Sequence, residues 1–261
     1  MTVLMHIEDL TLRTASRTLL TALRVDITSG ERWGLLGKNG AGKTTLLHTL
    51  ANLRLPAEGH ITIQGSDLSK LKQREIAQRI GLLFQDQIDA LPASVLETAL
   101  LGRHPHARGR LFDNEADLVS ARESLSRLGL LELETREVSS LSGGERQRLA
   151  LATLLAQKPN LLLLDEPSNH LDLGFQTNLI ELLRREVSSE EAAAQDRALV
   201  VATHDINLAA RLCNKIILLD GKGNARVGAT HEVLTRENLS AAYDCDIAKI
   251  ESEDRTLFYP H

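Results

Sequence analysis

The sequence lacks the features of secreted, disulfide-stabilised or membrane-spanning proteins. Its two cysteines, Cys213 and Cys245, lie far apart without metal-ligand spacing, which indicates reduced thiols in the cytosol. The N-terminus carries Glu8, Asp9 and Arg13 where a signal peptide would need an apolar run. No apolar stretch approaches the ~18 residues that a membrane-spanning helix needs, so we expect the chain not to cross a membrane by itself.

The sequence has no excess of positive charge, and aromatic side chains are scarce. The net charge is −5, with 25% of residues charged, and this composition gives no reason to expect a nucleic-acid partner. Aromatic residues make up only 3% of the chain, so few side chains could stack on a base. The length of 261 residues predicts one large domain, or one domain with a subdomain.

A glycine-rich stretch at residues 34–47, GLLGKNGAGKTTLL, carries the clearest motif. Gly37-x4-Gly42-Lys43-Thr44 is the phosphate-binding P-loop, in which backbone N–H groups and a helix N-terminus point at one anion. A glycine turn before a surface helix is the alternative. The leucines that follow the loop are spaced as on one face of a helix, which favours the P-loop because that loop leads into a helix. They are Leu46, Leu47, Leu50 and Leu53. We therefore predict a nucleoside triphosphate site formed by Gly37, Lys38, Asn39, Gly40, Ala41, Gly42, Lys43, Thr44 and Thr45.

Five apolar runs are continuous rather than alternating, which is typical of strands buried on both faces of a parallel sheet. They cover Trp33–Leu36, Ile80–Phe84, Leu161–Leu164, Ala198–Ala202 and Ile216–Leu219. Gln85 and Asp165 directly follow two of these runs, and His204 follows a third after Thr203. Ligands of open α/β sheets bind at the carboxyl ends of strands, so we expect these polar side chains near the nucleotide.

Residues 88–158 have a mostly helical pattern and predict an insert in the sheet domain. One helix, begun by residues 113–114 and ended by Gly129, would bury a face made of Leu118, Ala121, Leu125 and Leu128. A second helix is expected from about Gly143 to Gln157.

The N-terminal part predicts a small antiparallel sheet. Apolar residues alternate over 3–12, and HITIQG at 60–65 would supply another strand. Residues 188–198 are expected to be a solvated helix end and loop, and we assign them no function.

The string LSGGERQRLA at residues 141–150 is a second candidate phosphate-binding surface. Its serine is placed to cap a helix, and the two glycines would expose backbone N–H groups at the helix N-terminus. A plain helix start is the alternative, but two glycines there weaken a helix. A string such as LSGGE is expected by chance in fewer than about one in a thousand chains of this length. The predicted binding residues are Ser142, Gly143, Gly144 and Glu145.

The segment LLLLDEPSNHLD at residues 161–172 places two carboxylates after a buried strand. Asp165 would hold Mg²⁺, and Glu166 would polarise an attacking water. Alone, the two acids could form an ordinary turn, and a lone histidine is usually structural. Because the P-loop and LSGGE occur in the same chain, the catalytic interpretation is favoured. We predict Glu166, His204 and Gln85 as catalytic residues, and Thr44, Gln85 and Asp165 as metal ligands.

Together these residues resemble the ATP-binding-cassette ATPases over essentially the whole chain. The resemblance implies an α/β fold of the P-loop NTPase type, with a parallel core sheet, a small N-terminal antiparallel β subdomain and a helical insert, in one domain over residues 1–261. It implies ATP and Mg²⁺ as cofactors. By this resemblance, Gly37–Thr44 is the Walker A loop, Gln85 the Q-loop residue and Leu141–Glu145 the signature. Leu161–Asp165 is the Walker B strand, Ser168–Asp172 the D-loop and His204 the switch histidine. In that family two copies bind head to tail, and each ATP lies between the Walker A loop of one copy and the signature of the other.

Within that family, three segments are similar to the ATPase subunits of metal-chelate importers: LGRHPH at 101–106, EPSNHLDL at 166–173 and EVLT at 232–235. Such subunits power the import of iron–siderophores, haem or cobalamin through a separate dimeric permease, which a substrate-binding protein supplies. The resemblance therefore implies a peripheral subunit at the cytoplasmic face of the plasma (inner) membrane. The permease's coupling helices would dock beside Gln85 and the helical insert.

Two other functions remain as alternatives. One is a soluble cassette ATPase without a permease, such as the iron–sulfur assembly type, which the GRHPH segment disfavours. The other is a nucleotide-sensing module that binds ATP without hydrolysing it, which the presence of both Glu166 and His204 disfavours.

The chain departs from the family at the base-binding position. The resemblance implies an aromatic residue after the first strand that stacks on adenine, and the alignment places Thr14 there. We expect the adenine to rest instead on aliphatic carbons or on a long side chain such as Arg13 or Arg17.

Overall fold

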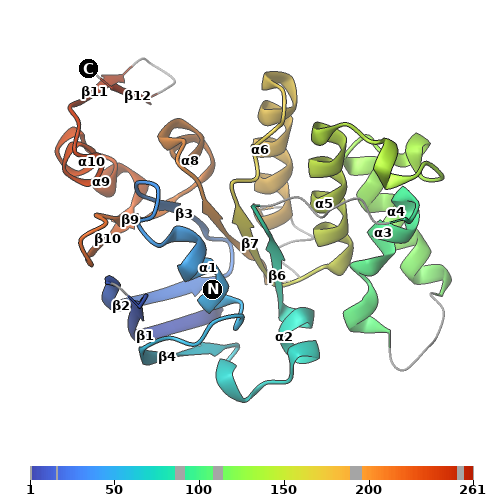
Figure 1. Cartoon of the computed structure of the whole chain (residues 1–261), viewed down its shortest axis with the longest axis horizontal. Coiled ribbons are helices and arrows are strands. Elements are labelled where there is room, and N and C mark those ends of the chain that lie inside the picture. Colours follow the sequence, from blue (N-terminus) through green and yellow to red (C-terminus); the bar gives the residue numbers. More distant parts are fainter. Residues whose placement is uncertain are drawn as a thin grey trace.

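A six-stranded sheet forms the centre of the protein (Figure 1). The computed structural model describes residues 2–15, 17–85, 92–107, 114–188, 196–251 and 256–260. The strand order is β10-β9-β3-β8-β7-β6, and all neighbours pair in parallel except β10, which is antiparallel to β9. The strands are β3 (Arg32–Leu36), β6 (Ile80–Leu83), β7 (Leu161–Asp165), β8 (Ala198–Ala202), β9 (Lys215–Leu219) and β10 (Ala225–Ala229). The predicted parallel sheet is confirmed, but the run Ile80–Phe84 was one residue too long, because β6 ends at Leu83 and Phe84 is 49% exposed.

Alternate residues of these strands enter two different hydrophobic cores. Leu163 and Val200 pack in one core with the N-terminal sheet, whereas their neighbours Leu164 and Val201 pack in the other with the helices. Burial on both faces explains why the runs are continuously apolar.

The N-terminal antiparallel sheet is also confirmed, with strand order β2-β1-β4-β5. Its strands are β1 (Val3–Arg13), β2 (Thr18–Thr28), β4 (Glu58–Ile63) and β5 (Ser66–Asp67). Helix α1 (Lys43–Leu50) follows the glycine-rich loop and buries Leu46, Leu47 and Leu50 in the core shared with this sheet. Including Leu53 in the same helical face was wrong, because α1 ends before it and the residue is 53% exposed.

Three helices pack against one another at one side of the sheet, at the right of Figure 1. They are α3 (Val95–Leu101), α4 (Glu115–Arg127) and α5 (Gly143–Gln157). Asn114 caps α4 by accepting a hydrogen bond from the Asp117 backbone, while Asp113 lies outside the described residues. Short 3₁₀ turns connect this region at His104–His106 (η2), Leu131–Leu133 (η3) and Val138–Ser140 (η4).

The remaining elements complete the layers around the sheet. They are η1 (Leu68–Lys70), α2 (Gln73–Arg79), α6 (Leu173–Ser188), α8 (Ile206–Leu212), α9 (Thr230–Val233), α10 (Arg236–Tyr243) and a terminal hairpin of β11 (Ile247–Glu251) and β12 (Thr256–Pro260). The predicted loop at 188–198 lies mostly outside the described residues, and β8 already begins at Ala198. Among the described residues, no helix has both the length and the apolar character to cross a bilayer.

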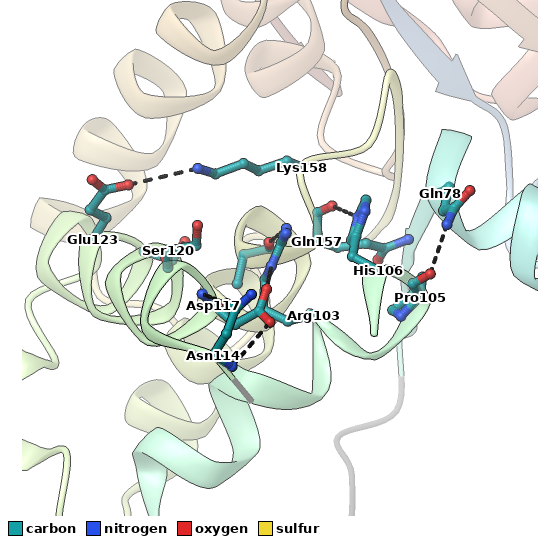
Figure 2. A network of polar contacts seen from close by, with 12 residues as sticks. Gln78, Arg103, Pro105, His106, Asn114, Asp117, Ser120, Glu123, Gln157 and Lys158 are labelled. Carbon is teal, nitrogen blue, oxygen red and sulfur yellow. Dashed lines mark hydrogen bonds and ion pairs between the residues drawn. The ribbon is translucent and has the colours of Figure 1, made fainter. Parts of the chain in front are cut away.

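The LGRHPH segment joins the helical region to α2 through polar contacts (Figure 2). Arg103 pairs with Asp117 of α4 at 2.9 Å and donates to the carbonyl oxygen of Ala156 at 2.8 Å. The carbonyl oxygen of Pro105 accepts from Gln78 of α2 at 2.8 Å, and a ring nitrogen of His106 lies 2.9 Å from the Gln157 carbonyl oxygen. The segment therefore has a structural role as a joint between α2, α4 and α5.

Breaking this joint is expected to destabilise the protein. In Arg103→Met, the buried Asp117 carboxylate would lose its cation, and we expect the free energy of unfolding to fall by about 3 kcal/mol. Urea unfolding followed by circular dichroism measures this change. Arg122→Met, which removes the exposed pair between Arg122 and Glu134, is the control and should leave the midpoint nearly unchanged. Equal effects of the two variants would contradict a structural role for the buried pair.

Candidate functional site

A cleft of about 630 Å³ lies at the carboxyl ends of the central strands. It brings together most of the residues that the sequence predicted, from the P-loop, from the end of β7 and from the residue after β6. Its lining consists of Thr14, Arg17, Leu19, Asn39, Gly40, Gly42, Lys43, Thr44, Thr45, Gln85, Asp165 and Glu166. Sequence reasoning missed Leu19, whose side chain packs at the position that a Cβ atom on Gly42 would meet.

The loop between β3 and α1 needs glycine at two positions. Gly37 has φ 148°, and a Cβ atom there would lie 2.8 Å from the carbonyl oxygen of Leu219. Gly42, the N-cap residue of α1, has φ 108° and no side chain that could cap the helix. The first backbone N–H groups of α1 can therefore be satisfied by an anion in the cleft.

Lys43 places a buried cation inside this loop. The residue is 8% exposed, and Nζ donates to the carbonyl oxygens of Gly37 at 2.7 Å and Lys38 at 3.3 Å. Burial lowers the pKa of the ammonium group, while Glu166 and Asp165 act in the opposite direction. A buried cation beside converging N–H groups fits a polyphosphate.

Thr44 and Asp165 form a pair of oxygen ligands next to this cation. The Thr44 hydroxyl donates to Oδ2 of Asp165 at 2.6 Å, although 121 residues separate them in the sequence. Asp165 is 2% exposed, and burial raises the pKa of its carboxyl despite the Thr44 hydrogen bond. A carboxylate and a hydroxyl at one point are the hard oxygen ligands that Mg²⁺ prefers, so these residues fit that ion.

Glu166 lies beside this pair and is fixed by two contacts. Its Oε1 atom is 2.9 Å from Nδ1 of His204, and its Oε2 atom accepts from the Thr203 hydroxyl at 3.1 Å. The Glu166 backbone has φ 48°, a left-handed conformation that costs a non-glycine residue on the order of 1 kcal/mol and is common at functional sites. The Glu166 side chain is 7% exposed and that of His204 is 64% exposed, so the pair joins a sheltered carboxylate to an accessible ring.

The LSGGE segment begins helix α5 as predicted, but it does not line the cleft. Ser142 is exposed and caps the helix, while the Glu145 carboxylate accepts from the Ser142 backbone at 2.7 Å. This hydrogen bond lowers the pKa of Glu145 and directs its carboxylate to the helix cap. A Cβ atom on Gly144 would lie 3.1 Å from the carbonyl oxygen of His170, so in the same chain the LSGGE segment lies close to the segment at 168–172.

Thr14 lines the cleft, as the alignment predicts. Its hydroxyl donates to the Arg17 carbonyl oxygen at 3.1 Å and accepts from the Arg17 N–H at 3.3 Å, which closes a tight turn. The Arg17 guanidinium then reaches over the P-loop to the carbonyl oxygen of Gly40. Arg13, the other candidate, pairs with Glu58 at 2.7 Å.

Comparison with known proteins identifies the family. The sequence pattern of the ABC transporter family matches residues 20–169. The chain is 36% identical over 245 residues to the cobalamin import ATP-binding protein BtuD of Halobacterium salinarum, covering 94% of this chain and 60% of that protein. It is 37% identical over 241 residues to the ferric enterobactin transport ATP-binding protein FepC of Escherichia coli, covering 90% of this chain and 85% of that protein.

A solved structure agrees with these relatives. A transporter in an inward-facing conformation, described as of the metal-chelate type, contains a chain with a TM-score of 0.84 and 30% identity, and the match covers 100% of this chain and 98% of that one. The present chain spans only 60% of the length of the halobacterial relative. It belongs to the ABC transporter family, and its α/β fold is the P-loop ATPase fold of that family.

Proposed function

We propose that this chain is the ATP-hydrolysing subunit of an importer for a metal chelate, of the iron–siderophore, haem or cobalamin kind. The observation that carries the proposal is the set of side chains gathered at one cleft. Lys43, the Thr44–Asp165 pair and Glu166 line it, and His204, which is not part of the lining, contacts Glu166. The cobalamin and ferric enterobactin relatives support the class of cargo. In this proposal one ABC ATPase domain spans residues 1–261 and carries a helical insert at about 88–158.

In this proposal each side chain has a role. Lys43 and the P-loop N–H groups bind the β- and γ-phosphates of ATP. Thr44 and Asp165, together with Gln85 of the cleft lining, would hold Mg²⁺, which supplies charge neutralisation for phosphoryl transfer. Glu166 accepts a proton from the attacking water. His204 orients that carboxylate through Nδ1–H, and in the imidazolium form, with both ring nitrogens protonated, Nε2 would donate to the γ-phosphate.

The proposed active site needs a second copy of the chain. Ser142, Gly143 and Gly144 present a helix N-terminus suited to phosphate, but this surface lies outside the cleft of its own chain. Head-to-tail pairing of two copies would bring each signature to the other copy's Lys43. Glu145 then acts by holding the cap of α5 rather than by touching the nucleotide.

The proposed membrane partners are an integral permease dimer and, indirectly, a substrate-binding protein. The ATPase would lie on the cytoplasmic face of the plasma membrane, with the permease docked beside Gln85 and the helical insert. The test is purification of the tagged chain from detergent-solubilised membranes, followed by reconstitution in vesicles with the permease encoded next to it. We expect ATP-dependent uptake of a ferric siderophore, haem or cobalamin. ATPase activity that stays wholly in the soluble fraction would instead favour a cassette ATPase without a permease.

The adenine site leads to a prediction of its own. We propose that the Arg17 side chain supports the adenine, because it lines the cleft whereas Arg13 is paired with Glu58. An aromatic ring adds about 1–3 kcal/mol of stacking per base in proteins that bind single strands, so Thr14→Tyr should tighten ATP binding several-fold. Calorimetric titration at fixed salt and Mg²⁺ measures this change.

Two further ligands control for the interpretation. GTP should gain about as much affinity as ATP, because stacking contacts the face of a base and not its edge. Inorganic tripolyphosphate should gain nothing. An unchanged or weaker affinity for ATP would show that Thr14 does not face the adenine.

A further inference from the structure

The C-terminal end of helix α10 lies against the phosphate loop, about 200 residues away in the sequence. Asp244, directly after this helix, pairs through Oδ2 with the ammonium group of Lys38 and through Oδ1 with Lys222 at 3.6 Å. These lysines, Lys38 most strongly, lower the pKa of the Asp244 carboxyl. The contact is therefore a charged pair at neutral pH between the C-terminal region and the residue that follows Gly37.

Tyr243, the last residue of α10, packs behind the same turn. Burial raises the pKa of its phenol to about 12, and the Gly37 backbone lies close enough to oppose that shift in part. The hydroxyl is buried, but it has no hydrogen bond of good geometry among the described residues. Tyr243 therefore supports the turn by packing, and Asp244 makes the directed contact.

Helix α10 is itself anchored on its far side by the terminal hairpin. The Ile247 N–H donates to the Ser240 hydroxyl at 2.9 Å, which joins β11 to α10. The Asn207 side-chain amide donates to the Phe258 carbonyl oxygen at 2.9 Å and accepts from the Phe258 N–H at 2.8 Å. Because Asn207 belongs to α8, these hydrogen bonds attach the terminal hairpin to the core. The hairpin in turn contacts α10, the helix that Asp244 follows.

The pair between Lys38 and Asp244 should matter most when phosphates bind. Lys43 donates to the carbonyl oxygens of Gly37 and Lys38, so its ammonium group fixes the turn from inside. A triphosphate competes for the same ammonium protons. When phosphates bind Lys43, the conformation of the turn therefore depends more on the pair between Lys38 and Asp244. Without that pair, the glycine-rich backbone can adopt many other conformations.

We propose that Asp244 is a positioning residue of the nucleotide site. It holds the Gly37–Lys38 turn in the conformation that binds phosphates, with α10 and the terminal hairpin as its support. The inference rests on the proposed function only in taking ATP as the ligand of the loop.

The test compares two aspartates of the same segment. Exposed ion pairs shift equilibria by up to about fivefold, so Asp244→Asn should raise the dissociation constant of ATP about two- to fivefold. The unfolding midpoint of the protein without nucleotide should stay the same. Asp246→Asn is the matched control, because Asp246 pairs with Arg236 at 2.9 Å within the segment. An unchanged affinity in Asp244→Asn, or an equal loss in both variants, would overturn the proposal.

A double-mutant cycle shows whether the effect passes through Lys38. Lys38→Met should weaken ATP binding as much as Asp244→Asn, and the double variant should be no weaker than either. Asp244→Glu should restore most of the affinity. Additive losses would overturn the proposal. Lys43→Ala separates this inference from the proposed function: if it binds ATP normally, the assignment of the P-loop fails, whatever the Asp244 variants do.

Discussion

Replacing Glu166 with glutamine is expected to abolish ATP turnover while ATP still binds. The amide keeps the shape of the side chain and its reach to Thr203 and His204, but it cannot accept a proton from water. General-base catalysis contributes about a hundredfold to ten-thousandfold, so the hydrolysis rate should fall by at least about a hundredfold. Phosphate release and calorimetric titration on the same sample separate turnover from binding.

The control for this prediction is a carboxylate outside the cleft. Glu134→Gln changes the same chemical group in an exposed pair with Arg122 and should keep the parental rate. Hydrolysis at the parental rate in Glu166→Gln would mean that another group accepts the proton. Loss of both binding and turnover would mean that Glu166 holds the nucleotide rather than activating water.

Two inactive variants are expected to recover activity when they are mixed. Lys43→Ala removes the buried cation of the P-loop, and Ser142→Arg blocks the helix N-terminus of the signature. Each homodimer then has no intact composite site. A mixed dimer has one, because the Ser142→Arg chain supplies Lys43 and the Lys43→Ala chain supplies Ser142. An equal mixture should reach at most about a quarter of the parental rate, since about half of the dimers are mixed and each holds one intact site of two.

The mixing ratio provides the control. Activity should be greatest at equal amounts and should vanish for either variant alone, with the total protein held constant. If the mixture stays inactive although both variants are folded, or if either variant alone is active, the signature does not act in trans.

The elements of the central sheet could be predicted because their signal is local. Residues such as Leu161–Leu164 are apolar at every position, and only burial on both faces of a sheet accommodates that pattern. The start of the helix at Gly143 was also marked by a local signal, its serine cap. The terminal hairpin and its contact with α8 had no such signal, because they depend on the pairing of Asn207 with a backbone more than fifty residues away.

Part of the site could also be predicted, since short motifs carry most of its chemistry. The sequence indicated Asp165 and Thr44, and the structure places them 2.6 Å apart. It gave no sign that Glu166 has a left-handed backbone, because no local pattern encodes that strain. It also gave no sign that Lys38 faces Asp244, since exposed ion pairs between distant segments leave no periodicity in a sequence.

The mass of Glu166→Gln in solution, measured by light scattering with and without ATP and Mg²⁺, tests the composite site most directly. Without nucleotide the account predicts one chain of 28.7 kDa, and with bound ATP that cannot be hydrolysed it predicts a particle of twice that mass. Ser142→Arg combined with Glu166→Gln should bind ATP and remain a single chain. A mass of 28.7 kDa for Glu166→Gln saturated with ATP would contradict the account.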